Sequence, residues 1–230
     1  MLPENAVNIK VRIKFSKTGS LKFISHLDLQ RTMQSSFLRS KLPIYFSEGF
    51  SPHPKVVFTP PLSVGVSSLT EFVDVKMLEN VSAEEILEKL NASFPKGLRA
   101  LECYEPKTKF SDIKWGLYGV GFELRGEAPE DICKKVQAVL SADEIMIEKF
   151  SKKGEAKRVN IAEGIRFVDA KLDGGVLFVR AKLSCDTDNF VNPKYIGETL
   201  AAAMPELFAG AEEETCRMEV YLADGETLFE

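Results

Sequence analysis

The sequence predicts an α+β fold made of two ferredoxin-like βαββαβ units in tandem, the second of them decorated. Three observations support this prediction. Two-residue alternation marks short strands, and helical periodicity marks segments between them. The order strand, helix, strand, strand, helix, strand can be followed twice along the chain. A polar, lysine-containing stretch, 106–114, lies between the two passes. We therefore expect two domains, 1–108 and 109–230.

The first predicted unit opens with a strand at 11–15, whose outer face would carry Lys10, Arg12 and Lys14. Ser25 is a good helix N-cap, and Asp28 stands where a capping-box acid belongs. Leu29, Met33 and Phe37 form an apolar stripe along this helix, which runs to about Lys41. The remaining expected elements are strands at 44–46, 55–59, 72–78 and 98–105 and a second helix capped by Ser82.

The second predicted unit repeats the scheme with additions. Asp173-Gly174-Gly175 separates two alternating runs, which is a strong hairpin signal. Asn192-Pro193 is a suitable start for a helix that continues through Ala203. The other expected elements are strands at 116–125, 144–150, 165–172, 176–183 and 216–222 and a helix whose apolar face holds Ile132, Val136, Val139 and Leu140.

Charge is distributed unevenly along the 230 residues. Residues 1–110 hold 15 lysines and arginines against 11 aspartates and glutamates, whereas residues 111–230 hold 15 against 23. This asymmetry predicts an N-terminal half that faces an anion or an acidic protein. The acidic pI of about 5.5 argues against a general nucleic-acid binder and leaves room only for a local basic surface.

No stretch resembles a signal peptide or reaches the length of a membrane span, so we expect a cytoplasmic protein without a membrane partner. The four cysteines, Cys103, Cys133, Cys185 and Cys216, are widely spaced and form no CxxC motif. We expect reduced, mostly buried thiols; a reactive thiol would need a histidine or cationic neighbour. The sequence predicts neither a metal site nor a cofactor.

The segment Lys22–Gly65 differs from the rest of the chain. It contains both histidines, His26 and His53, and five of the eleven prolines. If the first helix and the following Gly-Pro loop meet at one end of the sheet, then His26, His53 and Asp28 are candidate catalytic residues for acid/base chemistry. The structural alternative is that Asp28 caps the helix and His53 forms hydrogen bonds within its loop.

A second hypothesis assigns the same segment to binding. Phe50 stands in the loop GFSPHPK, which proline stiffens and glycine opens to a ligand. An exposed aromatic ring beside cations is a common way to hold single-stranded RNA. The candidate binding residues are Arg31, Arg39, Phe50, His53 and Lys55. The alternative is that Phe50 turns back into the core.

Three motifs, SHLDLQR, SEGFSPHPK and PPLSVGVSSLTEFVDV, stand in this order in the chain. Together they resemble the radical-SAM-linked protein family, a bacterial domain of unknown function found free-standing or joined to the C-terminal side of radical SAM proteins. The resemblance is dense over residues 10–105 and thinner beyond them. It implies a radical SAM protein as partner. The chain has no CxxxCxxC ligand set, so it is not itself the radical SAM enzyme.

These observations predict a non-catalytic accessory module that binds RNA or presents a substrate to a radical SAM partner. Two alternatives stay open. One is an enzyme acting on RNA with His26 and His53 as acid and base. The other is a protein–protein adaptor whose basic face meets an acidic partner.

Overall fold

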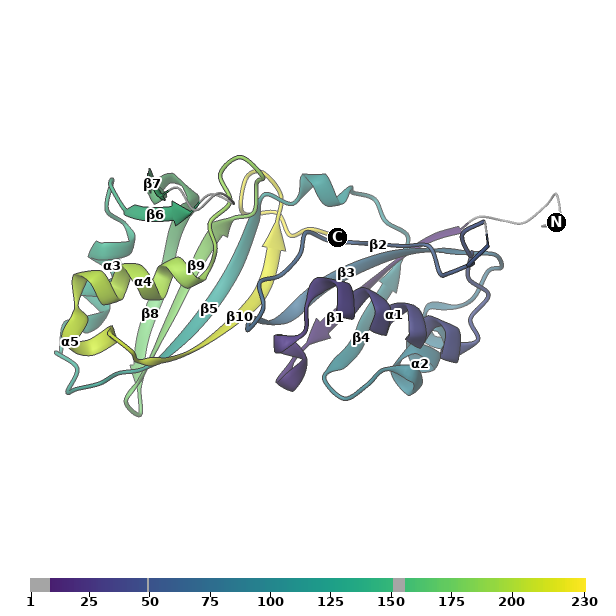
Figure 1. Ribbon diagram of the computed structural model, residues 1–230, viewed down its shortest axis with the longest axis horizontal. Helices are drawn as coiled ribbons and strands as arrows, with labels where there is room; N and C mark the ends of the chain where they lie inside the picture. Colours follow the sequence, from purple (N-terminus) through teal and green to yellow (C-terminus); the bar gives the residue numbers. More distant parts are fainter. Residues whose placement is uncertain (1–8, 49, 151–155) are drawn as a thin grey trace. The chain divides into compact units, whose positions relative to one another are not determined.

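The computed structural model describes residues 9–48, 50–150 and 156–230. The chain divides into two compact units, Met1–Asp112 together with Glu230, and Ile113–Phe229. Each unit combines a sheet with helices, which confirms the predicted mixed α+β class (Figure 1).

The first unit contains a four-stranded sheet in the order β4-β1-β3-β2, and every neighbouring pair is antiparallel. The predicted strand at 44–46 is wrong in detail. Only isolated bridges form there, because the segment changes partner within three residues: Ile44 pairs with Met77, whereas Phe46 pairs with Pro54. The elements in chain order are β1 (Ile9–Lys17), a 3-10 helix (Gly19–Phe23), α1 (His26–Ser40), β2 (Val56–Phe58), β3 (Ser67–Met77), α2 (Ala83–Ser93), β4 (Leu98–Tyr104) and a 3-10 helix (Phe110–Asp112).

Helices α1 and α2 cover one face of this sheet (Figure 1). The predicted stripe of α1, Leu29, Met33 and Phe37, is buried in the core. It packs with alternate residues of β1 and β3, among them Ile13 and Val75. The helix periodicity and the strand alternation therefore meet in one apolar layer, as their sequence patterns predict.

Arg12 lies on the opposite face of the sheet, where the sequence predicts an exposed cation, and it is completely buried. Its Nε and Nη2 donate to the two carboxylate oxygens of Asp74 at 2.8 and 3.1 Å. It also donates to the hydroxyl and the carbonyl oxygen of Thr108, at 2.9 and 3.0 Å, and to the carbonyl oxygen of Glu230 at 3.1 Å. The Phe110 ring centroid lies 4.4 Å from the guanidinium carbon. The prediction of exposure fails because the segment after β4 returns across this strand.

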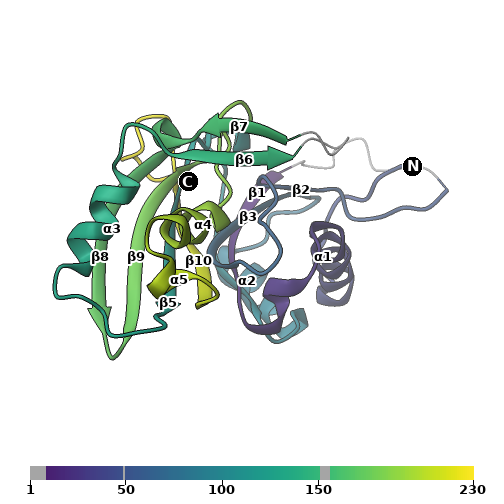
Figure 2. The same ribbon diagram turned by 60° about the vertical axis from the view of Figure 1, so that its left-hand side comes forward.

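The second unit has a sheet in the order β10-β5-β9-β8, again with antiparallel neighbours, and a separate β6-β7 hairpin. Figure 2 shows α3, α4 and α5 on one side of this sheet. The elements are β5 (Trp115–Glu123), α3 (Ile132–Leu140), β6 (Met146–Phe150), β7 (Ala156–Asn160), a 3-10 helix (Ala162–Gly164), β8 (Ile165–Asp173), β9 (Val176–Ser184), α4 (Lys194–Ala203), α5 (Pro205–Phe208) and β10 (Glu212–Tyr221).

The hairpin predicted at Asp173-Gly174-Gly175 joins β8 to β9, and both glycines have positive φ values of 57° and 85°. Glycine adopts this region without the steric cost that a Cβ brings. Among the described helices, none is long and apolar enough to cross a membrane.

We expect the change Asp74→Asn to lower the free energy of unfolding by about 3–5 kcal/mol, because it leaves the buried Arg12 guanidinium without its counter-charge. Urea unfolding followed by circular dichroism measures the loss. The matched control is Glu102→Gln, which removes an ion pair between the exposed Glu102 carboxylate and Lys14 at 3.5 Å and should cost about 0–1 kcal/mol. Equal losses in the two variants would contradict a structural role for the buried pair.

Candidate functional site

The predicted binding loop, residues 47–55, belongs to the connection between α1 and β2 in the first unit. Hydrogen bonds anchor its base. Tyr45 N–H donates to the carbonyl oxygen of Lys76 on β3 at 2.8 Å, and Lys55 N–H donates back to the Tyr45 carbonyl oxygen at 3.2 Å. The bridge between Phe46 and Pro54 closes the loop just above this point. The base of the loop is therefore held against the end of β3.

Hydrogen bonds across the loop hold its two arms together. Ser47 N–H donates to the His53 carbonyl oxygen at 2.9 Å, and His53 N–H donates to Ser47 Oγ at 3.2 Å. The His53 ring places Nδ1 3.0 Å from Ser47 Oγ and 3.2 Å from the carbonyl oxygen of Ser51. His53 thus organises its own loop, which is the structural alternative considered from the sequence. Gly49 of the GFSPHPK motif lies outside the described residues.

Phe50 projects from this loop with its side chain fully exposed. The sequence left open whether this ring packs into the core, and the structure places it in solvent. Burial of a phenylalanine side chain stabilises a fold by about 1.5–3 kcal/mol relative to exposure. The exposed ring gains none of this, so it is available to a ligand.

Two side chains that the sequence did not single out lie at the base of the loop. Lys76 on β3 places Nζ 5.9 Å from the centroid of the Tyr45 ring. The Tyr45 hydroxyl donates to Glu48 at 3.3 Å, and the negative charge of Glu48 raises the pKa of Tyr45. Strand alternation identifies Lys76 as an outward residue, but only the loop's path over the end of β3 shows that it faces Tyr45.

The two arginines predicted to bind a ligand differ in their contacts. Arg39 donates to Ser36 Oγ at 3.0 Å and to the carbonyl oxygen of Ser93, at the end of α2, at 2.8 Å. It therefore holds α1 against α2. Arg31 is exposed and forms only a loose ion pair with Asp28, with nitrogen and oxygen 3.5 Å apart. Arg31 is the arginine whose guanidinium is more open to a ligand.

His26 occupies the first turn of α1. Its Nε2 lies 3.1 Å from Nε2 of Gln30, and its ring meets Phe58 edge-on with centroids 5.7 Å apart. Ser25 is the N-cap of α1, and Asp28 is bonded to it twice: the Asp28 N–H donates to Ser25 Oγ at 3.1 Å, and its carboxylate accepts from the same hydroxyl at 2.6 Å. A shallow groove of about 460 Å³ adjoins the His26 ring, lined by His26, Gln30, residues 56–61, Phe110 and Ser111.

The structure does not bring His26 and His53 into one cluster. His26 contacts Phe58, which pairs with Val73 on β3. The loop of His53 is anchored near Lys76 and Met77, about 10–13 Å further along that strand. His53 also lies outside the groove that His26 lines. Within the described part of the chain, no group of three or more His, Cys, Asp or Glu side chains is arranged to hold a metal ion.

The cysteines are half-buried and form no disulfide with one another. Burial, followed by the negative charge of Glu84, raises the pKa of Cys103 to about 11. A thiol with such a pKa is protonated at neutral pH and is a poor nucleophile. Cys103 is therefore not a reactive thiol.

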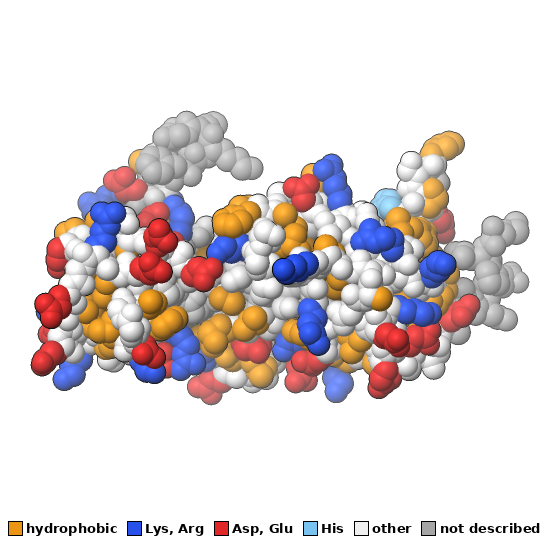
Figure 3. Space-filling model, turned by 90° about the horizontal axis from the view of Figure 1, so that it is seen from below, with side chains coloured by type: hydrophobic (Ala, Val, Ile, Leu, Met, Phe, Trp, Pro, Cys, Tyr) orange, Lys and Arg blue, Asp and Glu red, His pale blue; other side chains and the backbone are white. Residues whose placement is uncertain are grey.

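The surface charge is mixed. On the face drawn in Figure 3, Lys and Arg side chains are interspersed with Asp and Glu side chains and with apolar groups. Any attraction for an anion on this face therefore depends on local groupings of cations.

A family described as an uncharacterized protein conserved in bacteria (DUF2344) matches residues 10–193. The chain belongs to this family. The matched range includes α1, the 47–55 loop and β3, so the candidate site lies inside the family domain. No curated protein matches the chain.

Solved structures that are similar to the chain include two complexes that contain Cbf5 and Nop10. The first, a crystal structure of a Cbf5-Nop10-Gar1 complex, has 15% identity over 94% of this chain and a TM-score of 0.48. The second, an archaeal box H/ACA sRNP Nop10-Cbf5 complex, has 16% identity over 93% of this chain and a TM-score of 0.43. The chain spans about half of the length of each matched chain, 50% and 48%.

The contact between His26 and Gln30 predicts a tautomer. Because an amide nitrogen only donates, His26 Nε2 must accept, and the neutral ring must carry its proton on Nδ1. We expect nitrogen-15 NMR of the neutral imidazole to show a protonated Nδ1, and we expect Gln30→Leu to remove this preference. A proton found on Nε2 in the unmodified protein would contradict the assignment.

Proposed function

We propose that the first unit is a non-catalytic module that binds single-stranded RNA through the 47–55 loop and presents it to a radical SAM partner. The observation that carries the proposal is the fully exposed Phe50 ring on a loop closed by its own hydrogen bonds. We include a radical SAM partner because the three sequence motifs resemble those of the radical-SAM-linked family.

Stacking supplies the binding energy in this proposal. An aromatic side chain that stacks on a base contributes about 1–3 kcal/mol without requiring a particular base. The bonds between Ser47 and His53 and the bridge from Phe46 to Pro54 fix the loop before binding. A fixed loop loses less conformational entropy when a ligand arrives, so more of the stacking energy appears as affinity.

Cations near the loop supply phosphate contacts. Lys55 is exposed at the end of the loop, and Lys76 lies beside Tyr45 at its base. Arg31 is exposed on α1 and only loosely paired. This small grouping accounts for local RNA binding by a chain whose net charge is −4. Arg39 is assigned a positioning role, because its guanidinium is bonded to Ser93.

A protein–protein adaptor is the second candidate function, favoured by exposed apolar side chains near the start of α1. Phe23, Leu27 and Val64 are 64%, 53% and 62% exposed. The bond from Gly65 N–H to the Lys22 carbonyl oxygen, 2.8 Å long, holds the segments of Phe23 and Val64 together. The alternative of an RNA-acting enzyme with a His26–His53 pair has no such support, because the two rings occupy separate surroundings.

We also infer that both units are ferredoxin-like and that they correspond to domains 1–108 and 109–230. The sheet orders support this inference. The inserted β6-β7 hairpin of the second unit is left out of this comparison. The four remaining strands of each unit then follow the same order across the sheet, which by chain order is fourth, first, third, second. Under this inference, the RNA-binding loop is an elaboration of the connection from α1 to β2.

We expect Phe50→Ala to weaken binding of a fluorescein-labelled oligouridylate by about 5- to 150-fold, since it removes a stacking contact of about 1–3 kcal/mol. Fluorescence anisotropy at low ionic strength measures the affinity. The matched control is Phe178→Ala, which removes an aromatic side chain that is 50% exposed on β9 of the second unit and should leave the affinity unchanged.

The affinity of the unmodified protein should also fall as salt rises, because phosphate contacts release counterions. Lys55→Gln should reduce the slope of log affinity against log salt by about 0.7. Salt-independent binding, or equal losses for Phe50→Ala and Phe178→Ala, would overturn the RNA proposal and leave the adaptor as the better candidate.

A further inference from the structure

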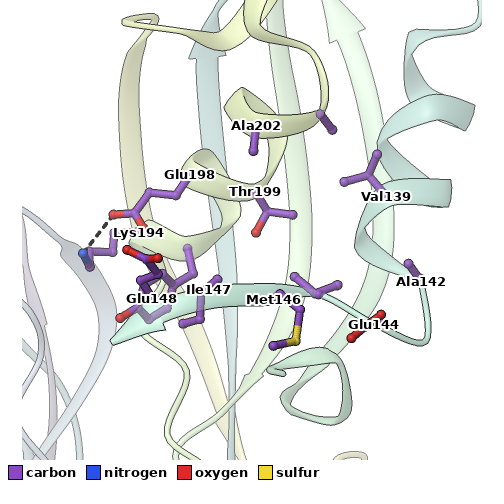
Figure 4. A pocket seen from close by; sticks show the side chains of 13 residues that line it. Val139, Ala142, Glu144, Met146, Ile147, Glu148, Lys194, Glu198, Thr199 and Ala202 are labelled. Carbon is purple, nitrogen blue, oxygen red and sulfur yellow. Dashed lines mark hydrogen bonds and ion pairs between the residues drawn. The ribbon is translucent and has the colours of Figure 1, made fainter. Parts of the chain in front are cut away.

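A groove of about 920 Å³ lies in the second unit between the β6 segment, α3 and α4 (Figure 4). Five consecutive residues, 144–148, line it from β6 and the two positions before that strand. The flat face of a strand presents only every second side chain. Lining by consecutive residues therefore indicates that the backbone edge of β6 borders the groove.

The hydrogen bonds of the hairpin identify this edge as the unpaired one. Ile161 N–H donates to the Ile145 carbonyl oxygen at 3.0 Å, so the backbone groups of Ile145 point toward β7. Those of Met146 and Glu148 point the other way, because neighbouring residues in a strand alternate. In the described chain, β7 is the only strand that pairs with β6. Figures 1 and 2 both show β7 on one side of β6 and α4 on the other.

A buried hydroxyl also faces the groove. Thr199 Oγ1 on α4 is inaccessible to solvent and has no hydrogen-bond partner in the described protein. A helical threonine commonly bonds to the carbonyl oxygen four residues earlier. Here the hydroxyl is instead directed toward β6 (Figure 4). The side chains that line the groove therefore cover an unsatisfied polar group, which a ligand reaches only by displacing them.

Among the described residues, the charge around the groove is negative. Glu144, Glu148 and Glu198 are exposed at its border, and the one cation among the described lining residues, Lys194, is paired with Glu198 at 2.8 Å. Apolar side chains form the remainder of the lining, including Ile147, which is buried, and Met146, which is 40% exposed. A ligand that complements the groove carries positive charge and apolar groups together.

We propose that the outer edge of β6 binds an extended basic segment of a partner protein, which adds as a third strand to the β6-β7 sheet. Backbone hydrogen bonds to Met146 and Glu148 would supply affinity, and alternating basic and apolar side chains would meet the glutamates and the apolar lining. This site lies in the second unit, so the inference goes beyond the RNA proposal and does not rest on it.

A second copy of the chain fits the edge less well. If two β6 strands paired antiparallel about Met146, then Glu144 of one copy would stand opposite Glu148 of the other. Like charges directly opposite each other destabilise a strand pair. The charge pattern therefore favours a basic partner over self-association.

The test uses the full-length protein and short blocked peptides of alternating lysine and valine, labelled for fluorescence anisotropy. We expect this peptide to bind and a glutamate–valine peptide not to bind. A lysine–valine peptide that is N-methylated at every second residue keeps its charge but loses the N–H donors of one edge. Its affinity should fall by about tenfold or more, because each lost backbone bond is worth about 0.5–1.5 kcal/mol.

Variants of the chain locate the site. Met146→Pro removes an outward N–H and should weaken binding of the lysine–valine peptide by about tenfold. Thr199→Val keeps the side-chain shape and should weaken binding by about 3- to 10-fold, so it tests the groove even if the proline variant fails to fold. Glu148→Gln should weaken binding by up to about 5-fold, whereas Glu226→Gln, an exposed glutamate away from the groove, should have no effect.

Several results would overturn the proposal. Equal binding of the methylated and unmethylated peptides would show that charge alone acts. Absence of binding, or unchanged affinity in both Met146→Pro and Thr199→Val, would exclude a site at this edge. A dimer of the free protein in sedimentation that Met146→Pro dissociates would assign the edge to a second copy of the chain.

Discussion

The ion pair between Arg12 and Asp74 is the constraint on which the first unit depends. Buried charges must be matched, so β1 and β3 pair in the register that sets Arg12 opposite Asp74. A slip of one residue would move every side chain of β3 to the other face of the sheet. In the observed register, Val73 and Val75 enter the core, while Lys76 points outward at the base of the 47–55 loop. The position of the candidate site thus follows from the strand register.

The loop itself combines order with exposure. Its base is bonded to the end of β3, its arms are joined through Ser47 and His53, and its aromatic residue lies in solvent. A protein gains nothing in stability from an exposed phenylalanine, whereas a base that stacks on the ring gains about 1–3 kcal/mol. This arrangement suits a surface that holds a substrate. The separate surroundings of His26 and His53 give no comparable arrangement for acid/base chemistry.

Local patterns predicted much of the fold. The Ser25 cap and the stripe of Leu29, Met33 and Phe37 defined α1, because both depend on residues close together in sequence. The burial of Arg12 and the contact of Arg39 with Ser93 were not predictable in this way, since each requires a partner 54 or more positions away. Phe50 was an open question for a related reason: whether a loop residue reaches the core depends on the path of the whole loop. The role of Lys76 beside Tyr45 likewise required the tertiary path.

The central claim is that Phe50 stacks on an unpaired base, and a fluorescence titration of Phe50→Trp tests it most directly. The chain contains one other tryptophan, Trp115, which is 9% exposed and provides a constant background. Stacking of an indole on a base quenches its emission, so saturation with oligouridylate should quench the exposed tryptophan at position 50. Emission that stays unchanged while anisotropy shows the RNA to be bound would place the base elsewhere and contradict the account.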